Sequence, residues 1–337
     1  MWVNTHGDGG FLRRGEASAG KRALTAARRA GTDRPPLMSD PTAAYLAPEG
    51  FLAELQQELG DSVREVHGDL VLASGATQAP AWCANVWLAP QRIPIASIGD
   101  GAKKLRAIQR NWALCSTGHH RRAALIADAL PKVSAKPLQF GDPAPTAPLG
   151  AWTLLAPDLI LASPTCSSAF PNGMVQFIED KDGPPNRAYL KLWEAFTLLG
   201  RRPQPGELCL DLGSSPGGWT WVLQKLGAHV ISVDKAPLDE RVSTLPGVEF
   251  RQQSAFALEP KEVGTVDWLV ADVACYPPRL LSLVQRWLAA GTVRNFVCTL
   301  KFQGATDFAA MQGFQAVAGS RLTHLFHNKH ELTWFKT

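Results

Sequence analysis

The second half of the chain alternates short apolar segments with segments of helical period. The apolar segments are continuous runs bounded by turn residues, as in the buried strands of a parallel sheet. They cover residues 207–212, 229–233, 248–251, 266–271 and 295–300, and two further strand-like segments follow at residues 322–326 and 331–335. Strands that alternate with helices form a doubly wound parallel sheet. We therefore predict an α/β, Rossmann-like fold for this half, with the last two segments as an antiparallel hairpin at the sheet edge.

The composition is that of a globular protein from a reducing compartment. Of the 337 residues, 45% are apolar and 19% are charged, which suffices for a sizeable core. This length favours two domains, and no apolar run reaches the roughly 18 residues that a membrane span needs. The 6 cysteines form no CxxC pair, which favours buried thiols over a disulfide framework or a zinc site. We expect a cytoplasmic protein with no metal and no membrane partner.

The first residues differ from the rest in charge. Residues 1–37 hold seven basic and three acidic side chains, and the difference of four equals the net charge of +4 of the whole chain. They show no lasting apolar period and no apolar segment of a secretory signal. We predict a disordered basic tail. The alternative is that Met38 is the natural start and that residues 1–37 are a non-native extension.

The residues between this tail and the predicted sheet divide into two parts. Residues 38–136 are predicted to form an N-terminal α+β domain with strands at 44–46, 63–66 and 70–73 and helices at 48–59, 103–112 and 121–130. Residues 137–183 are predicted to be a linker, rich in Pro, Ala and Gly, that carries a connecting hairpin of residues 152–155 and 159–162. Residues 184–337 then form the sheet domain.

A basic stretch in the N-terminal part is a candidate RNA-binding site. Residues 103–122 contain no acid, and their basic residues are Lys103, Lys104, Arg106, Arg110, Arg121 and Arg122, with His119 and His120 beside them. Trp112 lies among these cations. Basic residues around an aromatic ring suit phosphate contact and base stacking. The alternative is a solvated helix face with Trp112 in the core.

A glycine-rich turn follows the first strand of the predicted sheet, in the sequence DLGSSPGGWT at residues 211–220. Ligands of such sheets bind at the carboxyl ends of the strands, where glycines allow a close backbone approach. The turn is not GxGxxG, so a dinucleotide is not expected. Asp234 ends the next strand and can bind both hydroxyls of a ribose. This pair suits a nucleoside cofactor without a pyrophosphate, such as S-adenosylmethionine. The alternative is a tight turn with a solvated Asp234.

The turn, with Asp272 and Lys301 at successive strand ends, resembles the FtsJ-like family of S-adenosylmethionine-dependent ribose 2′-O-methyltransferases. The resemblance covers residues 184–337 and is strongest to the RlmM type, which methylates a cytidine ribose of large-subunit ribosomal RNA. It implies a class I methyltransferase sheet. Residues 46–51 resemble the start of the RlmM type, whose N-terminal region contains an RNA-binding THUMP domain. The stretch that follows is shorter and diverged here, so we expect a reduced THUMP-like domain.

The resemblance also implies a catalytic tetrad, which falls on Lys191, Asp272, Lys301 and Glu331. In this interpretation Lys301 is the general base for the ribose hydroxyl. Lys191 lowers the pKa of Lys301 and orients the ribose, Asp272 holds the cluster, and Glu331 positions Lys191 or the substrate. Two alternatives come from the sequence alone. Lys191 could pair with Glu194 on an exposed helix, and Glu331 could be a charge on an edge strand.

The expected cofactor residues lie on the turn and at the strand ends. They are Gly213, Ser215, Pro216, Gly217, Gly218, Trp219, Asp234, Ser254 and Asp272. Two of the matching positions depart from the family pattern. Ser254 stands where family members carry an acid that contacts the adenine, and Ala188 replaces a small hydroxyl residue.

The expected function is transfer of a methyl group from S-adenosylmethionine to a ribose 2′-hydroxyl of RNA, with a cytidine of large-subunit rRNA as substrate. One alternative is a methyltransferase of another RNA, such as tRNA or mRNA. A methyltransferase of a base amine or a protein is disfavoured, because residues 272–275 read DVAC and not Asn/Asp-Pro-Pro-aromatic. A further alternative is a non-catalytic RNA-binding relic, which would predict a broken tetrad.

Overall fold

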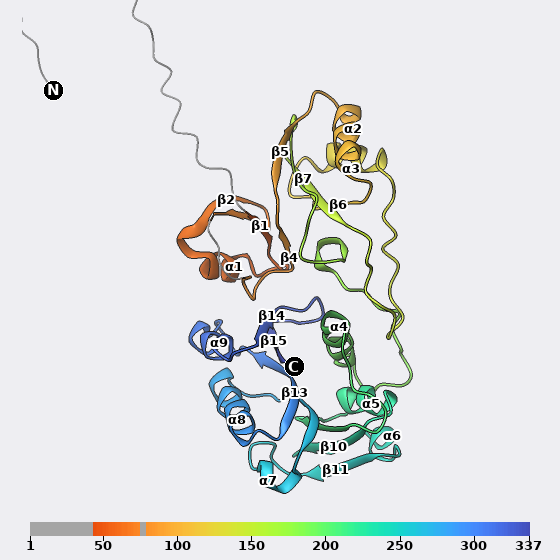
Figure 1. Cartoon of the computed structure of the whole chain (residues 1–337), viewed down its shortest axis with the longest axis vertical. Helices are drawn as coiled ribbons and strands as arrows, with labels where there is room; N and C mark the ends of the chain where they lie inside the picture. The colour runs from red at the N-terminus through yellow and green to blue at the C-terminus, as the bar shows by residue number, and fades with distance from the viewer. Residues whose placement is uncertain (1–42, 75–78) are drawn as a thin grey trace, which may run out of the picture. The chain divides into compact units, whose positions relative to one another are not determined.

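A seven-stranded sheet organises the second half of the computed structural model, which describes residues 43–74 and 79–337. The predicted basic tail lies outside the described residues. The strand order is β11-β10-β9-β12-β13-β15-β14 (Figure 1). The strands are β9 (Leu208–Leu212), β10 (His229–Asp234), β11 (Val248–Gln252), β12 (Val266–Ala271), β13 (Val293–Lys301), β14 (Ser320–Thr323) and β15 (Glu331–Lys336). The five strands from β9 to β13 pair in parallel, and β15 runs antiparallel between β13 and β14. The predicted α/β, Rossmann-like class is confirmed.

Helices cover both faces of this sheet, as Figure 1 shows for α4 and α5 on one side and α8 and α9 on the other. The helices are α4 (Tyr189–Leu199), α5 (Gly218–Lys225), α6 (Glu240–Ser243), α7 (Pro260–Val263), α8 (Pro277–Ala290) and α9 (Phe308–Gln315). Successive strand residues point to opposite faces. In β9, Leu210 joins the hydrophobic cluster of α8 and α9, and Cys209 joins that of α4 and α5. Burial on both faces explains why these strands are continuous apolar runs.

Two four-stranded sheets come from the first half of the chain. The first has the order β2-β3-β1-β4, and the second has the order β5-β8-β7-β6. The strands are β1 (Ala43–Leu46), β2 (Val63–His67), β3 (Leu70–Ala73), β4 (Asn85–Trp87), β5 (Gln91–Pro94), β6 (Trp112–Leu114), β7 (Gly150–Ala156) and β8 (Leu159–Ser163). The helices are α1 (Leu52–Leu59), α2 (Ile98–Ile108) and α3 (His120–Asp128), with short 3-10 turns η1 (Gly60–Ser62) and η2 (Pro171–Gly173). Apolar residues of α2 and α3 pack on the second sheet.

Several details of the first half differ from the prediction. The helix expected at residues 103–112 is α2, which ends at Ile108, and Trp112 opens β6. Trp112 is buried, and its Nε1 donates to the carbonyl oxygens of Leu105 and Gln109, both at 3.0 Å. The expectation that Trp112 stacks on RNA bases is therefore wrong, and the core alternative holds. Strands β4 and β5 were not predicted, because β4 has three residues and β5 contains Gln, Arg and Pro, which are not typical of a buried strand.

The hairpin that we placed in the connecting segment is β7 and β8, and it pairs with β6 and β5. This sheet therefore uses residues from both sides of the predicted boundary at residue 136. The division of the chain into domains stays a prediction, as does the reduced THUMP-like domain. No helix within residues 43–74 and 79–337 is long and apolar enough to cross a membrane.

An aromatic cluster joins the N-terminal strands to the seven-stranded sheet. Trp82 is fully buried, and its ring centre lies 4.6 Å from that of Phe51, 5.8 Å from Phe302 and 5.7 Å from His330. Phe302 directly follows Lys301, and His330 directly precedes Glu331. The N-terminal part therefore packs against the backbone on which two of the predicted tetrad residues stand.

Candidate active site

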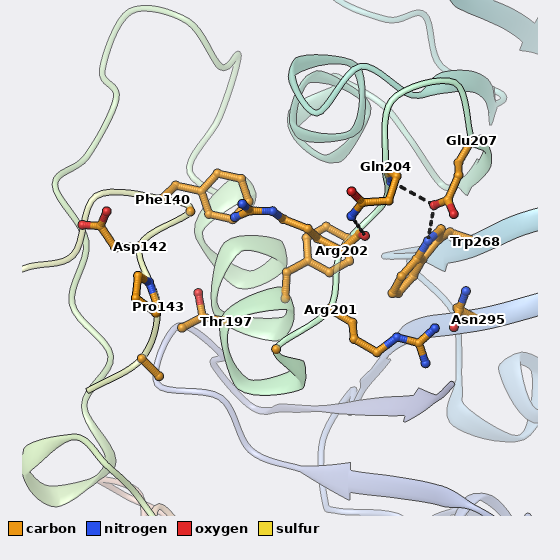
Figure 2. A pocket seen from close by; sticks show the side chains of 14 residues that line it. Phe140, Asp142, Pro143, Thr197, Arg201, Arg202, Gln204, Glu207, Trp268 and Asn295 are labelled. Carbon is orange, nitrogen blue, oxygen red and sulfur yellow. Dashed lines mark hydrogen bonds between the residues drawn. The ribbon is translucent and has the colours of Figure 1, made fainter. Parts of the chain in front are cut away.

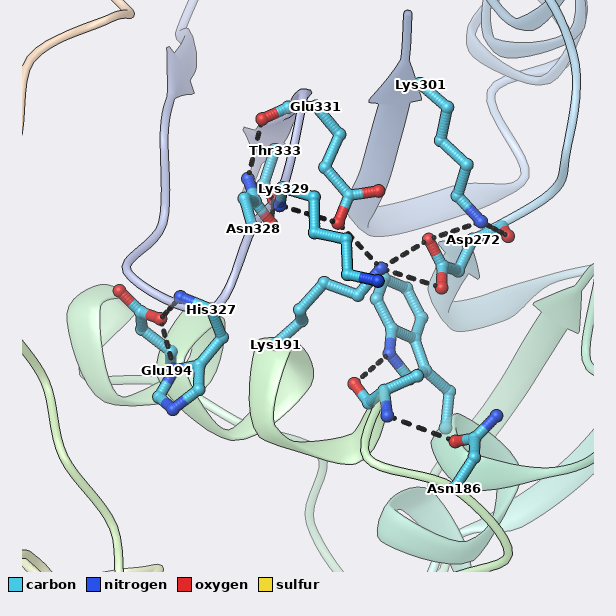
Figure 3. Close-up of polar contacts among 12 residues, drawn as sticks. Asn186, Lys191, Glu194, Asp272, Lys301, His327, Asn328, Lys329, Glu331 and Thr333 are labelled. Atoms are coloured by element: carbon cyan, nitrogen blue, oxygen red, sulfur yellow. Dashed lines mark hydrogen bonds and ion pairs between the residues drawn. The ribbon is translucent and has the colours of Figure 1, made fainter. Parts of the chain in front are cut away.

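Lys191 lies at the centre of the candidate site. The first turns of α4 are buried from Tyr189 to Phe196, because this helix sits between the sheet and the segment that precedes it. The Lys191 Nζ lies 3.0 Å from both carboxylate oxygens of Asp272 and 3.0 Å from Glu331 Oε1 (Figure 3). An ammonium group has three N–H donors. Each donor of Lys191 therefore has a carboxylate acceptor.

Asp272 binds the second lysine as well. Lys301 Nζ lies 3.0 Å from Asp272 Oδ1 and 2.5 Å from the Asp272 backbone oxygen. Asp272 follows β12 and Lys301 ends β13, and the carboxyl ends of these parallel neighbours meet at one edge of the sheet. Glu331 opens β15 and stands opposite Lys301 in the strand register. The structure thus brings all four predicted tetrad residues together.

The two alternatives for this group are wrong. Lys191 and Glu194 lie on a buried helix, and Glu194 has other partners: it accepts from the backbone nitrogens of Phe326 and His327 and bonds the His327 ring nitrogen at 2.7 Å. Glu331 is buried, and β15 is an inner strand of the sheet.

The charge state of Lys191 follows from these contacts. Burial disfavours the ammonium form, but the carboxylates of Asp272 and Glu331 outweigh burial and raise the pKa of Lys191. Lys191 therefore stays charged at neutral pH. The Lys301 side chain is more exposed than that of Lys191, at 27% against 10%. Its two contacts leave one direction of its nitrogen open for a further partner.

The glycine turn brings the loops after β9 and β12 into contact. Gly213 has a φ of +81°, and a Cβ there would lie 2.6 Å from the Val273 Cα. A larger residue would push apart the two strand ends between which the ligand of such a sheet binds. Gly217 has a φ of +120° and allows the chain to turn into α5.

The remaining predicted cofactor residues hold this turn against the loop after β10. Asp234 accepts hydrogen bonds from the backbone nitrogens of Ser215, at 3.1 Å, and Ala236, at 2.9 Å. The Ser215 hydroxyl donates to the Pro237 oxygen, and the Pro216 oxygen accepts from Asp239. Each Asp234 oxygen keeps acceptor capacity for a ligand hydroxyl. Ser254 follows β11 and caps the nitrogen of Phe256.

Two of the predicted cofactor residues, Gly218 and Trp219, also fix α4 to α5. Trp219 is buried, and its Nε1 donates to the Ala188 oxygen at 2.9 Å. A Cβ on Gly218 would lie 2.2 Å from Asn186 Oδ1, which accepts from the Ala188 nitrogen. These contacts set where α4 begins and hence where Lys191 points. Sequence reasoning missed Asn186 and Glu194, because Gly218, which packs against Asn186, and His327, which bonds Glu194, lie far away in the chain.

Asp211 and Ser214 were also missed as site residues. Both are buried, and Asp211 Oδ1 and Ser214 Oγ have no hydrogen-bond partner in the described part of the chain. The other Asp211 oxygen accepts from Thr220 Oγ1 at 2.7 Å. Burial raises the pKa of Asp211 to about 7, and the nearby carboxylates of Asp272 and Asp234 add to the shift. An acid inside an otherwise apolar strand was the available signal.

A cavity of about 780 Å³ opens in front of the tetrad. Its lining residues include Lys191, Lys301, Lys329, Glu331, Arg187, Phe177 and Phe326. His327 and His330, which lie close to Lys329 and Glu331 in sequence, are half-buried. His327 bonds Glu194, and His330 bonds Thr306 within the aromatic cluster. Lys329 is exposed.

A second cavity, of about 500 Å³, lies at the opposite end of the strands (Figure 2). It is lined by Arg201, Arg202, Glu207, Trp268 and Asn295, which stand before or near the start of the parallel strands. No predicted site residue lines this cavity. The ligand site of a sheet of this type lies at the carboxyl ends, so the tetrad end remains the candidate.

The predicted RNA-binding residues are dispersed over two helices and their flanks. Lys104 pairs with Asp100 and donates to the Pro94 oxygen, and Arg106 donates to the Ala129 oxygen. Lys103 and Arg121 are exposed, and Arg122 is half-buried. Arg110 lines a cavity close to the connecting segment. Contact of these residues with RNA stays a prediction.

Residues 185–305 match the family model described as FtsJ-like methyltransferase. The ribosomal RNA large subunit methyltransferase M of Halorhodospira halophila is 36% identical over 157 residues, which are 44% of this chain and 46% of that protein. The protein of that description from Thauera aminoaromatica is 31% identical over 195 residues, 53% of each chain. The chain thus spans about half the length of these curated relatives. The solved structure of TrmN from Thermus thermophilus covers 88% of this chain and 99% of its own at 14% identity, with a TM-score of 0.36, which is too low to bear on function.

Replacement of Asp211 by asparagine tests the buried acid. Its folded-state pKa of about 7 lies above the unfolded value of 3.8, so the stability that Asp211 contributes is present below about pH 4 and is lost as the pH rises through about 7. Asparagine does not titrate. The free energy of unfolding of Asp211→Asn relative to wild type should therefore rise between about pH 5 and about pH 8, by roughly 2.7 kcal/mol.

Urea unfolding of both proteins at the two pH values measures this difference, and the other titrating groups cancel because both proteins carry them. An equal difference at both pH values would show that Asp211 is ionised throughout.

Proposed function

We propose that the chain transfers a methyl group from S-adenosylmethionine to a ribose 2′-hydroxyl of RNA, since residues 185–305 match the family model described as FtsJ-like methyltransferase. A cytidine of large-subunit rRNA is the proposed substrate, since relatives described as large-subunit rRNA methyltransferases match this chain over about half their length. The observation that carries the proposal is the tetrad. Lys191 and Glu331 are 140 residues apart in sequence, yet they meet beside a cavity large enough for a nucleotide.

The residues around the glycine turn fit this cofactor. The carboxylate of Asp234 has spare acceptors for two ribose hydroxyls, and the turn carries no group that would select a pyrophosphate. Among the residues that the structure describes, Asp211 Oδ1 and Ser214 Oγ have no partner beside the turn, which leaves both atoms for a polar group of the ligand. When bound, S-adenosylmethionine supplies an electrophilic methyl group on a positively charged sulfur.

Lys301 is the proposed general base. A ribose hydroxyl is a weak nucleophile, and a base in hydrogen-bonding reach must take its proton as the new carbon–oxygen bond forms. Lys191 cannot accept a proton, because all three of its N–H donors bind carboxylates. Lys301 lines the cavity, and its two contacts leave one direction of its nitrogen open for the hydroxyl.

Lys191, Asp272 and Glu331 are proposed to fix the position of that base. The Lys191 ammonium balances part of the charge of Asp272, and the same carboxylate holds the Lys301 side chain in place. Glu331 and Asp272 together fix the Lys191 side chain, so that its charge faces the cavity at a set place. A fixed geometry raises the rate because the ribose hydroxyl and the base are already aligned when the substrate binds.

Asp234→Ala should weaken S-adenosylmethionine binding by about 10- to 100-fold, since hydrogen bonds to a charged group are worth about 1.5–3 kcal/mol. Isothermal titration calorimetry measures the dissociation constant. Glu249→Gln is the matched control, because Glu249 lies on the neighbouring strand β11 and its carboxylate binds Arg251 at the surface. Equal dissociation constants for Asp234→Ala and wild type would remove Asp234 from the cofactor site.

Lys301→Ala should lower methyl transfer by about 100-fold or more while the dissociation constant of S-adenosylmethionine stays close to that of wild type, since a base acts on the acceptor. Single-turnover transfer of a tritiated methyl group to rRNA measures the rate. Lys336→Ala is the control, because Lys336 lies at the opposite end of β15 from Glu331. If Lys301→Ala kept more than about a tenth of the wild-type rate, corresponding to a loss below about 1.4 kcal/mol, Lys301 would not be the base.

A further inference from the structure

Another cavity, lined by three basic residues, adjoins the tetrad cavity. Its volume is about 460 Å³, and it is lined by Arg110, Asn111, residues 132–136, Leu138, Pro145, residues 147–149, residues 169–171, Met174 and Gln176. Arg110, Lys132 and Lys136 contribute three positive charges, and no carboxylate is among the lining residues. All three side chains are exposed, and none of them pairs with an acid of residues 43–74 or 79–337. We call this cavity the basic groove.

The basic groove and the tetrad cavity share a wall. Residue Leu138 pairs with the segment around Phe177: its nitrogen donates to the Gln176 oxygen at 2.8 Å, and its oxygen accepts from Ile178 at 2.9 Å. Gln176 lines both cavities. Pro137 lines the tetrad cavity, and its neighbour Lys136 lines the groove. A chain that leaves the tetrad across this wall therefore enters the basic groove.

One cation of the tetrad cavity, the Lys329 ammonium, has no carboxylate partner within residues 43–74 and 79–337. Arg187 pairs with Glu179 at 2.7 Å, and Lys191 and Lys301 bind the tetrad acids. The amine of Lys329 lines the same cavity and forms no ion pair with the described acids (Figure 3). Each of the two cavities also has a large exposed apolar side chain: Phe326 at the tetrad cavity is 43% exposed, and Met174 in the groove is 39% exposed. Unpaired cations beside exposed apolar side chains suit phosphates and the faces of unstacked bases.

We propose that the basic groove binds the single-stranded RNA segment next to the methylated nucleotide, with its phosphates on Arg110, Lys132 and Lys136. This proposal rests on the proposed function. Three tetrad side chains, those of Lys191, Asp272 and Glu331, are only 10–13% exposed, so an acceptor ribose reaches the tetrad only when its nucleotide has left a double helix. The neighbouring nucleotides of the same strand then cross the wall at Gln176. Lys329 contacts the phosphate at the acceptor.

The test compares three variants of the full chain. The groove variant is Arg110→Gln, Lys132→Gln, Lys136→Gln. A matched control removes three exposed cations elsewhere: Arg64→Gln, Lys225→Gln, Lys261→Gln. A third variant, Lys103→Gln, Lys104→Gln, Arg106→Gln, tests the face of α2. The probes are an oligocytidylate of about 12 nucleotides and the same strand annealed to its complement, and binding is measured at several salt concentrations.

The groove variant should bind the single strand at least about 10-fold more weakly than wild type, and the slope of log affinity against log salt should fall by about 2, since each lost phosphate contact removes about 0.7 for single strands. The control should match wild type, and the duplex should bind more weakly than the single strand. An unchanged slope for the groove variant would overturn the proposal. A loss confined to the α2 variant would do the same and would place RNA on that helix.

Two readouts separate this proposal from the proposed function. S-adenosylmethionine affinity and methyl transfer to rRNA are measured on the same proteins. If the wild type bound the single strand through the groove but transferred no methyl group, the proposed function would be contradicted and the proposed RNA site would stand. If the groove variant transferred methyl groups at the wild-type rate under limiting RNA, the proposed RNA site would be contradicted and the proposed function would stand.

Discussion

The carboxylate of Asp272 binds both lysines of the site, and the arrangement of the surrounding elements depends on this contact. Lys191 reaches it from α4, Lys301 from β13, and Glu331 closes the group from β15. Four mostly buried charges are tolerated only because each faces an opposite charge; removal of one partner leaves a buried charge unpaired, at a cost of about 3–5 kcal/mol. The four charges of the candidate site therefore tie a helix to three strands.

The seven-stranded sheet and most of the tetrad could be predicted from the sequence, because strands buried on both faces are apolar runs and the polar residue that ends each run is conspicuous. Asp272 and Lys301 are such residues. Lys191 could not be placed from its own helix, since its partners lie 81 and 140 residues further along. The role of Glu194 was hidden for the same reason. Trp112 was misplaced because a three-residue strand has no detectable period, and the burial of its ring is set by residues far away.

The first half of the chain reaches the site in two ways. Trp82 packs against Phe302 and His330, whose neighbours in sequence are Lys301 and Glu331. These rings are closely packed, and closely packed side chains do not move independently. The N-terminal residues therefore help to fix the positions of Lys301 and Glu331. The segment around Leu138 and Gln176 forms a wall of the tetrad cavity and a wall of the basic groove. The same backbone segment therefore borders both the groove proposed to bind RNA and the cavity proposed to hold the methylated nucleotide.

The central claim is that the methyl group goes to a ribose 2′-oxygen. Large-subunit rRNA made by transcription, and hence unmethylated, is incubated with the full chain and methyl-tritiated S-adenosylmethionine, and the product is then hydrolysed in alkali. A 2′-O-methyl group blocks attack of that oxygen on the adjacent phosphodiester bond. We expect the tritium in alkali-stable dinucleotides that begin with cytidine. Tritium in mononucleotides would place the methyl group on a base and contradict the account.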